Sequence, residues 1–539
     1  MPPFARVAFV RLCLLLACST GLHVAGAIVY VSQAGDGTTG DSWETALPNI
    51  SDALDQVGAG EKIYVAEGTY AISEPMAVPT DVEILGGFSG SAKGSSGEND
   101  PGMYPTILDG EDIAGSAFVC NNVLDVLIDG FTFTGFVGSG DGYGKGGAIR
   151  CEADADVQIR DCFFTRNDID GYGGGVNVIN AFALIEDCVF LNNSAQEGGG
   201  VKVHSGSLLM RHCIFNSNDA GLIGGGFSGY DSDTRTRDCL FIDNDGPYGG
   251  GIECHEGTRA EFENCLFAKN RASVQGGGLT FTFQDGVAVI NCTIADNETD
   301  GNGGGIFLHD STGEIINSIF SKNNAHAIFE NSTTVDPSVE NCLFHANPDG
   351  AYFDEGSTSI ATASGPGGMN SVLAEAEGNI DGDPLFANPK VDDYHLTTGS
   401  PAIDAASKDD APNHDIDGDS RPIKPSKAGS KFDIGFDEYN PGALLVVDAP
   451  GDGDKLKIGK EYKILWHSDG YTGSSVRLEL VRGGEVVRAI GDKTPNDGFA
   501  KWTVPNDVPA RKGYSVRITN VNDPIFSDES EGGFKIVNP

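Results

Sequence analysis

The stretch Asp187-Cys188-Val189-Phe190-Leu191-Asn192-Asn193 is one copy of a motif that occurs eight times and decides the fold. Its second residue recurs at spacings of 26, 25, 26, 26, 27, 26 and 24. A fixed period of this length indicates a repeat protein. The second residues are Cys162, Cys188, Cys213, Cys239, Cys265, Cys292, Ser318 and Cys342. The asparagines that end the copies are Asn167, Asn193, Asn218, Asn244, Asn270, Asn297, Asn323 and Asn347.

Glycine clusters and short alternating segments fill the rest of each repeat. Gly198 to Gly200 precede Val201-Lys202-Val203, and this alternation of apolar and polar residues is typical of a half-buried strand. Glycine supplies tight turns, and asparagine tolerates a left-handed corner and bonds to nearby backbone. About 26 residues hold three short strands and turns but no βαβ unit. We therefore predict an all-β chain built as a parallel β-helix with three short strands per coil.

The cysteines belong to this pattern. Of 12 cysteines, two lie in the first 27 residues, and seven of the other ten occupy the second motif position. The simplest interpretation is a column of small buried hydrophobic side chains. Disulfides between adjacent coils are the alternative, because the strand spacing lies within the range of a bridge. A zinc site is disfavoured, since ligands in one straight row cannot surround an ion.

The N-terminus has the features of a Sec-type signal peptide over residues 1–27. Arg6 and Arg11 precede an apolar run, and Ala25-Gly26-Ala27 resembles a cleavage site. A lipoprotein signal ending at Cys18 is a weaker alternative. Further on, Ile50, Ala53, Leu54 and Val57 follow helical spacing, with Asn49 or Ser51 as N-cap. We expect this short helix to cover the open N-terminal end of the solenoid.

Two regions of the chain resemble secreted β-helix proteins. Ile63 to Tyr70 and Gly86-Gly87-Phe88 are similar to the N-terminal part of pectin-lyase-like right-handed β-helix proteins, and the repeats resemble polymorphic outer-membrane-type passengers. Ser400 to Asp404, Asp415 to Gly418 and Asp433 to Gly435 resemble the choice-of-anchor Q pattern. The resemblance implies a right-handed solenoid over residues 28–395, closed by residues 396–443. It also implies an exported surface protein rather than a particular enzyme.

From residue 444 onward the glycine clusters stop and alternating strands appear. About seven short strands in residues 444–539 predict a small antiparallel Ig-like β-sandwich. Ile464 to Trp466, Asn496 to Phe499 and Trp502 to Pro505 resemble the Ig-like domain of cell-wall-synthesis and Ser/Thr-rich GPI-anchored proteins. That resemblance implies a cell-surface module without known catalytic residues.

The acidity belongs to the solenoid region. The chain has a formal net charge of −43, with 35 basic and 78 acidic residues. Residues 28–443 hold 20 basic and 64 acidic residues, whereas residues 444–539 hold 13 and 14. Such a charge excludes a nucleic-acid binder and an anionic membrane surface. No run outside the leader is long and apolar enough to span a bilayer. We expect a monomer, secreted or held at the cell surface, whose partner is a polysaccharide or another surface molecule.

One patch of polar residues is the candidate catalytic site. The second and fourth residues after each glycine cluster are expected to face solvent, which groups Lys202, His204, Tyr230, Glu253 and His255 across three coils. Imidazoles and carboxylates at that spacing suit proton abstraction or glycosidic cleavage. However, the polygalacturonase Gly-His-Gly and Arg-x-Lys elements are missing. We therefore expect adhesion or polysaccharide binding, and a polysaccharide lyase or glycoside hydrolase acting on an acidic glycan is the alternative.

Calcium is the metal that the sequence favours, although no cofactor is required by this interpretation. Asp381, Asp383, Asp415, Asp417 and Asp419 offer oxygen ligands on glycine-containing loops. No EF-hand loop is complete, and solvated acidic turns are the alternative.

Overall fold

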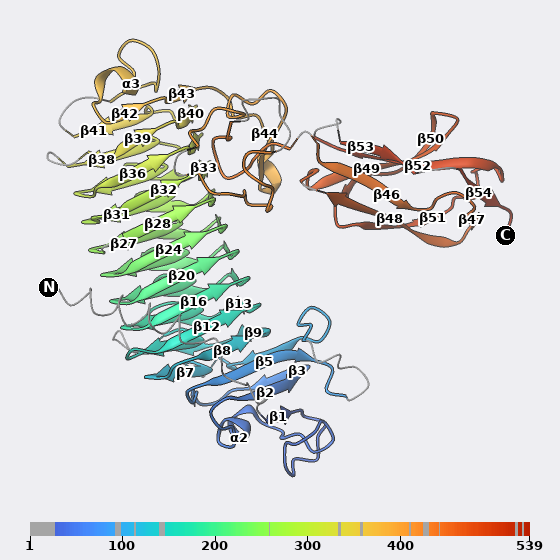
Figure 1. Cartoon of the computed structure of the whole chain (residues 1–539), viewed down its shortest axis with the longest axis horizontal. Coiled ribbons are helices and arrows are strands. Elements are labelled where there is room, and N and C mark those ends of the chain that lie inside the picture. The colour runs from blue at the N-terminus through green and yellow to red at the C-terminus, as the bar shows by residue number, and fades with distance from the viewer. Residues whose placement is uncertain are drawn as a thin grey trace, which may run out of the picture.

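The structure is a computed structural model in which an elongated β-helix is followed by a separate β-domain (Figure 1). It describes residues 27–91, 99–112, 115–138, 146–257, 259–332, 336–355, 359–408, 411–423, 431–440, 442–469, 471–522, 526–530 and 533–539. The expected signal peptide, apart from residue 27, lies outside these residues.

Four parallel sheets, which we name A, B, C and D, form the walls of the solenoid. The central coils, from β8 to β35, run through them in the order A, B, D, C, whereas the coils at either end lack a strand of sheet D. Sheet A contains β1 (Ile28–Val31), β2 (Glu61–Ala66), β5 (Val82–Phe88), β8 (Val126–Asp129), β12 (Asp156–Arg160), β16 (Phe182–Glu186), β20 (Ser207–Arg211), β24 (Asp233–Arg237), β28 (Arg259–Glu263), β32 (Val287–Ile290), β36 (Gly313–Ile316), β39 (Ser338–Glu340) and β42 (Ala376–Glu377). Sheet B contains β3 (Gly68–Ala71), β6 (Thr106–Asp109), β9 (Phe131–Thr134), β13 (Phe163–Thr165), β17 (Val189–Leu191), β21 (Ile214–Asn216), β25 (Leu240–Ile242), β29 (Leu266–Ala268), β33 (Thr293–Ala295), β37 (Ile319–Ser321), β40 (Leu343–His345) and β43 (Ile380–Asp381).

Sheet C contains β4 (Met76–Ala77), β7 (Phe118–Asn121), β11 (Ile149–Glu152), β15 (Val176–Ile179), β19 (Val201–His204), β23 (Phe227–Tyr230), β27 (Ile252–His255), β31 (Leu279–Thr282), β35 (Ile306–His309), β38 (Ile328–Asn331) and β41 (Tyr352–Asp354). Sheet D contains β10 (Val137–Gly138), β14 (Asp168–Ile169), β18 (Ser194–Glu197), β22 (Asp219–Ile223), β26 (Asp245–Tyr248), β30 (Arg271–Gln275) and β34 (Glu298–Thr299). The predicted parallel β-helix is confirmed. Sheet D was not foreseen, because its strands are short and its residues are mostly polar.

Equivalent residues stack in register from coil to coil. Phe164, Phe190, Phe215 and Phe241 face inward, and neighbouring rings lie 4.6 to 4.8 Å apart and nearly parallel. The described cysteines are all buried, free thiols beside this core. Cys120 and Cys151 form a further pair, because they are register partners in adjacent strands of sheet C.

A ladder of asparagine side chains lines the turn between sheets B and D. Asn244 Nδ2 donates to the carbonyl of Phe215 at 3.0 Å and to Asn270 Oδ1 at 3.0 Å. Its own Oδ1 accepts from the backbone N–H and the side chain of Asn218. The pattern continues from Asn167 to Asn347. The left-handed corner lies one residue earlier, for example at Asp243 (φ 54), so these asparagines act through their side chains rather than through their backbone conformation.

Both ends of the solenoid are covered. Helix α2 (Ile50–Leu54) lies beside β1, β2 and β4 and buries Ile50, Ala53 and Leu54. Asn49 is its N-cap residue, but its side chain makes no capping hydrogen bond. At the other end, helix α3 (Met369–Val372) inserts Met369 into the solenoid core.

The described residues of the range 386–440, which we name the side segment, pack against the outer face of sheet B. They include β44 (Phe386–Asn388), the short helix η1 (Pro389–Val391) and β45 (Asp393–Leu396). Tyr394 and Phe436 cover Leu266 and its neighbours in sheet B, and Ile434 packs with Ile319. The expectation that residues 396–443 close the end of the helix is therefore wrong. The outer face of sheet B is apolar in these coils and must be covered.

The C-terminal domain is formed by two sheets around Trp466, Trp502 and Tyr514. One sheet holds β46 (Leu444–Ala449), β48 (Glu461–Asp469) and β51 (Phe499–Thr503). The other holds β47 (Lys455–Lys457), β54 (Phe534–Val537), β52 (Lys512–Asn520), β49 (Ser475–Arg482), β50 (Glu485–Pro495) and β53 (Ser527–Glu529). The predicted antiparallel arrangement is confirmed, apart from the parallel pair β47 and β54.

Replacing a central member of the asparagine ladder should destabilise the solenoid. Asn244→Ala leaves the buried N–H of Asn218 and the carbonyl of Phe215 without these partners, and we expect the free energy of unfolding to fall by about 2–4 kcal/mol. Denaturant titration measures this loss. Asn347→Ala is the control, because Asn347 is partly exposed at the end of the ladder and water can replace its bonds. An equal loss in both variants would contradict a ladder that acts through buried bonds.

The thiol column predicts the redox state of the purified protein. Titration of the denatured, unreduced chain lacking residues 1–27 should find ten free thiols, since all ten cysteines of that chain are unpaired. Finding six or fewer would show that adjacent coils are bridged by disulfides.

Candidate functional site

The second positions of the sheet C strands form a buried polar row. Lys202, Ser228 and Glu253 are register neighbours and are only 0 to 3 % exposed. The interpretation that Lys202 and Glu253 face solvent is therefore wrong. The ends of the sheet D strands fold back over this row, as the contact between Thr280 Oγ1 and the carbonyl of Gln275 shows.

A chain of charges and hydrogen bonds connects this row. Lys202 Nζ lies 2.7 Å from Glu197 Oε2 of β18 and donates to Ser228 Oγ at 2.9 Å. Ser228 Oγ in turn donates to Glu253 Oε2 at 3.3 Å. Burial raises the pKa of Glu253 to about 7, although the positive charge of Lys202 opposes the shift. The row supports the interior packing and offers no contact to a substrate.

The fourth positions of four of these strands, and the residue that follows β31, carry rings that reach the surface. We name His204, Tyr230, His255, Phe283 and His309 the ring row. His204 stacks on Tyr230 with ring centroids 5.0 Å apart, and the next neighbours along the row follow at 5.5, 5.8 and 5.0 Å. Tyr230 donates its hydroxyl hydrogen to Glu256 at 2.8 Å. Phe283 is 46 % exposed, so the row presents apolar faces to solvent.

Two imidazoles of the row, His204 and His255, have a lowered pKa. Burial lowers the pKa of His204 and of His255, and the positive charge of Lys202 lowers both further. A neutral imidazole can accept a proton or stack against an apolar surface. The ring row therefore combines weak bases with stacking platforms.

The patch predicted from the sequence contains three of these five rings and includes neither Phe283 nor His309. Phe283 follows β31 in a turn with φ 51, one position after Thr282, which is the register partner of His255. A search at a fixed position in each repeat therefore returned Thr282. The role of Glu197 as partner of Lys202 was also missed, because the sequence does not indicate that sheet D folds over sheet C.

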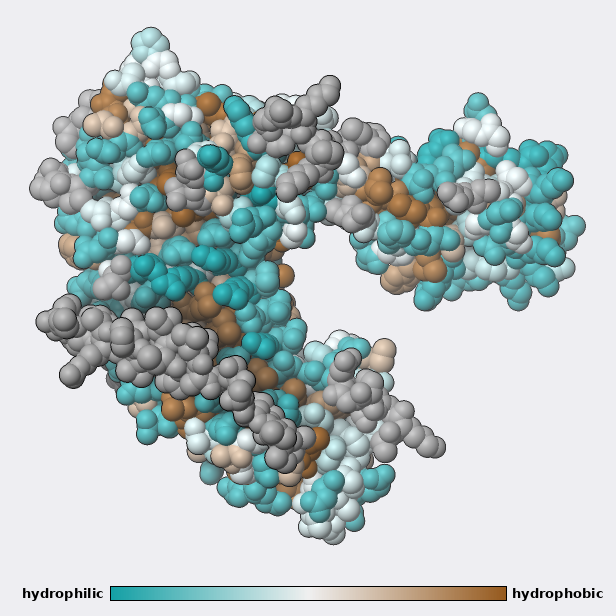
Figure 2. All heavy atoms as spheres, viewed as in Figure 1, coloured by the Kyte–Doolittle hydropathy of each residue, from teal (hydrophilic) through white to brown (hydrophobic). Residues whose placement is uncertain are grey.

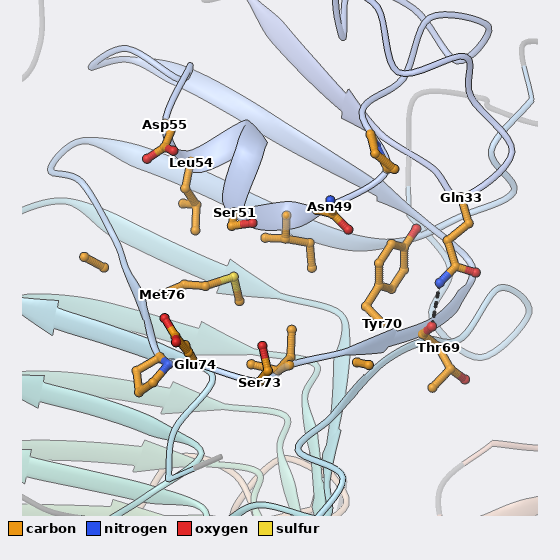
Figure 3. A pocket seen from close by; sticks show the side chains of 16 residues that line it. Gln33, Asn49, Ser51, Leu54, Asp55, Thr69, Tyr70, Ser73, Glu74 and Met76 are labelled. Carbon is orange, nitrogen blue, oxygen red and sulfur yellow. Dashed lines mark hydrogen bonds between the residues drawn. The ribbon is translucent and has the colours of Figure 1, made fainter. Parts of the chain in front are cut away.

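A separate pocket of about 730 Å³ lies beside helix α2 at the N-terminal end (Figure 3). Asn49, Ser51 and Asp55 come from the helix region, and Tyr70 and Glu74 from the opposite wall. Gln33 Nε2 donates to the carbonyl of Thr69 at its rim. The residues that line it include the carboxylates of Asp55 and Glu74 but no lysine, arginine or histidine.

The carboxylates expected to bind calcium are not gathered into one cluster. Asp381 accepts hydrogen bonds from the backbone of Ala363 and Ser364. Asp415 accepts three backbone N–H groups, and Asp419 accepts from Asn440. Among the described residues, the group with metal-ligand spacing contains only Asp417 of the five, together with His395 and Asp437.

The molecular surface drawn in Figure 2 is mostly hydrophilic, with apolar residues in separate patches. No described helix is long and apolar enough to cross a membrane.

Two family models match parts of the chain. The model described as a right handed beta helix region matches residues 111–267 and 230–364, and the Kre9/KNH-like N-terminal Ig-like domain matches residues 449–528. These matches support the solenoid and the C-terminal domain. Neither match identifies the choice-of-anchor Q type.

Among solved structures, the pectin methylesterase from Aspergillus niger is similar to 65 % of this chain, over 94 % of its own length. The two share 15 % sequence identity with a TM-score of 0.24. A search of curated proteins finds no match.

The buried carboxyl of Glu253 predicts a pH-dependent stability. The folded state holds the proton up to about pH 7, while the unfolded chain releases it near 4.5, so the fold loses stability as pH rises through this window. Glu253→Gln removes that loss. We expect the variant to exceed the parent by up to about 3 kcal/mol at pH 8 and to match it at pH 4.

Chemical denaturation at the two pH values measures the difference. Glu298→Gln, on the exposed side of sheet D, is the control and should show no comparable change. A Glu253→Gln effect that is independent of pH would contradict the assignment.

Proposed function

We propose that this protein is an exported surface protein that binds a polysaccharide along the ring row. The observation that carries the proposal is the row itself, which places one partly exposed ring on each of five consecutive coils. Aromatic faces offer large contact areas at low entropic cost. A chain of sugar rings lying parallel to the solenoid axis would meet a new ring at each coil.

The charge of the solenoid favours a neutral glycan. Residues 28–443 hold 64 acidic and 20 basic residues, and Lys202 is withdrawn into the interior. A polyanionic glycan would be repelled unless cations bridged it to the surface. The signal-like N-terminus and the match to a Kre9/KNH-like domain support an extracellular or cell-surface location.

A polysaccharide lyase or hydrolase is the alternative function, and burial weakens it. It would need the patch of five residues as its acid and base groups, but Lys202 and Glu253 lie beneath sheet D. His204 and His255 are the members of that patch which could serve as bases at the surface.

Truncating the ring row should weaken glycan binding. A glycan array with the purified chain lacking residues 1–27 identifies the ligand, and affinity electrophoresis then compares variants. The double variant with Tyr230→Ala and Phe283→Ala lacks two rings of the row. It should bind the glycan about 10-fold more weakly or worse, since each stacking contact is worth about 1 kcal/mol. No product should accumulate when the protein is incubated with the bound glycan.

Phe499→Ala is the matched control, because Phe499 is 42 % exposed but lies in the C-terminal domain. Retained binding in the double variant would refute the proposal. Product formation that disappears in His204→Ala and His255→Ala would instead establish the enzymatic alternative.

A further inference from the structure

A histidine outside the ring row lies where the side segment meets sheet B and the C-terminal domain. His395 belongs to β45, and its side chain is 16 % exposed. The ring of Tyr471, from the C-terminal domain, stacks on it with centroids 3.5 Å apart. Phe436 lies on another side, with centroids 5.3 Å apart. The imidazole is therefore held by packing in one orientation.

A buried carboxylate sets the direction of the His395 ring. Asp393 Oδ1 lies 3.0 Å from Nδ1 of His395, and Asp393 Oδ2 accepts a hydrogen bond from Ser474 Oγ at 2.9 Å. Asp393 is only 3 % exposed. A carboxylate that binds one ring nitrogen of a histidine is the usual support for a metal ligand at the other nitrogen.

The other nitrogen faces two further carboxylates. Nε2 of His395 lies 3.1 Å from Asp417 Oδ2, yet it is buried and forms no aligned hydrogen bond. Asp437, 3 % exposed, completes a group in which all three ligand atoms lie within 4.8 Å of one another. Ligands of a tetrahedral zinc ion, each about 2.0–2.2 Å from the metal, are about 3.3–3.6 Å apart, so the three atoms need to move together only slightly to bind one.

Hydrogen bonds pre-position both carboxylates. Asp415 Oδ1 accepts the backbone N–H of Asp417 at 3.0 Å, and its Oδ2 accepts that of Glu438 at 2.9 Å, so Asp415 ties the two ligand-bearing segments together. Asp437 Oδ2 accepts the backbone N–H of Leu396 at 2.6 Å. The backbone beside each ligand is thus fixed without any ion.

A cleft of about 290 Å³ leads to this group. His395 and Asp417 line it together with His212, Asp238 and Asp392, which belong to sheet B turns and to the side segment. The extra carboxylates favour entry of a cation over an anion.

We propose that His395, Asp417 and Asp437 bind one divalent transition-metal ion of the zinc class, with an open position toward the cleft. An imidazole nitrogen with two carboxylate oxygens suits zinc and its neighbours, whereas calcium takes six to eight oxygen ligands. The ion would connect three separate positions of the side segment beneath Tyr471. It would thereby stabilise the contact between the side segment and the C-terminal domain.

Calorimetric titration tests the site. The protein used comprises residues 28–539 and has been stripped of metal. Zn²⁺ should bind with a stoichiometry of one, at least about 10-fold more tightly than Ca²⁺ or Mg²⁺, and should raise the melting temperature. Asp417→Asn should weaken Zn²⁺ binding by at least about 10-fold, and so should Asp393→Asn, through loss of ring support. Asp417 is 30 % exposed at the side chain, so its variant should fold.

Two controls separate this site from general binding of metal by acidic loops or surface histidines. Asp419→Asn changes the same loop two residues away, and His212→Ala changes the same cleft, and both should keep the parent affinity. Anomalous diffraction at the zinc edge should place the ion against His395. No Zn²⁺ binding, equal binding by Asp417→Asn, or an ion beside His212, Asp238 and His414 would overturn the proposal.

Discussion

The asparagine ladder is the interaction on which the rest of the structure depends. Parallel strands alone leave the turn between sheets B and D without regular partners for its backbone groups. Each asparagine supplies those partners to the coil before it and connects to the next asparagine, as Asn244 does between Phe215 and Asn270. The stacked phenylalanines beside the ladder then repeat at the strand spacing.

Register explains why sheet C carries one buried row and one exposed row of side chains. Second and fourth positions point to the same side of a strand. The sheet D strands cover the second positions, which leaves Lys202 and Glu253 in a closed network. The fourth positions lie beyond that cover, so rings such as Tyr230 reach solvent. The same register on sheet B leaves Leu266 and Ile319 facing outward, and the side segment packs on them and brings His395 to its place.

The parts of the fold that could be predicted follow from local repetition. A period near 26 and the glycine clusters follow from the comparison of successive copies, and the alternation around Val201 is visible within one copy. The candidate site was less predictable, because exposure depends on contacts between different strands of one coil. Glu253 occupies a position that the strand pattern predicts to be exposed, but its side chain is buried in the structure. Phe283 does not occupy the fourth position after the glycine cluster. It lies in the turn that follows β31, so the repeat pattern does not identify it.

The sequence by itself determined the β-helix, the Ig-like C-terminal domain and the concentration of negative charge on the solenoid. These properties depend on composition and on the spacing of motifs along the chain. Both can be read without knowing which distant residues are in contact. Only the tertiary structure decided that residues 386–440 lie along sheet B and that Asp417 and Asp437 meet His395 there. Those three residues are separated by loops of no fixed period, so their convergence depends on how the side segment packs against the apolar outer face of the solenoid.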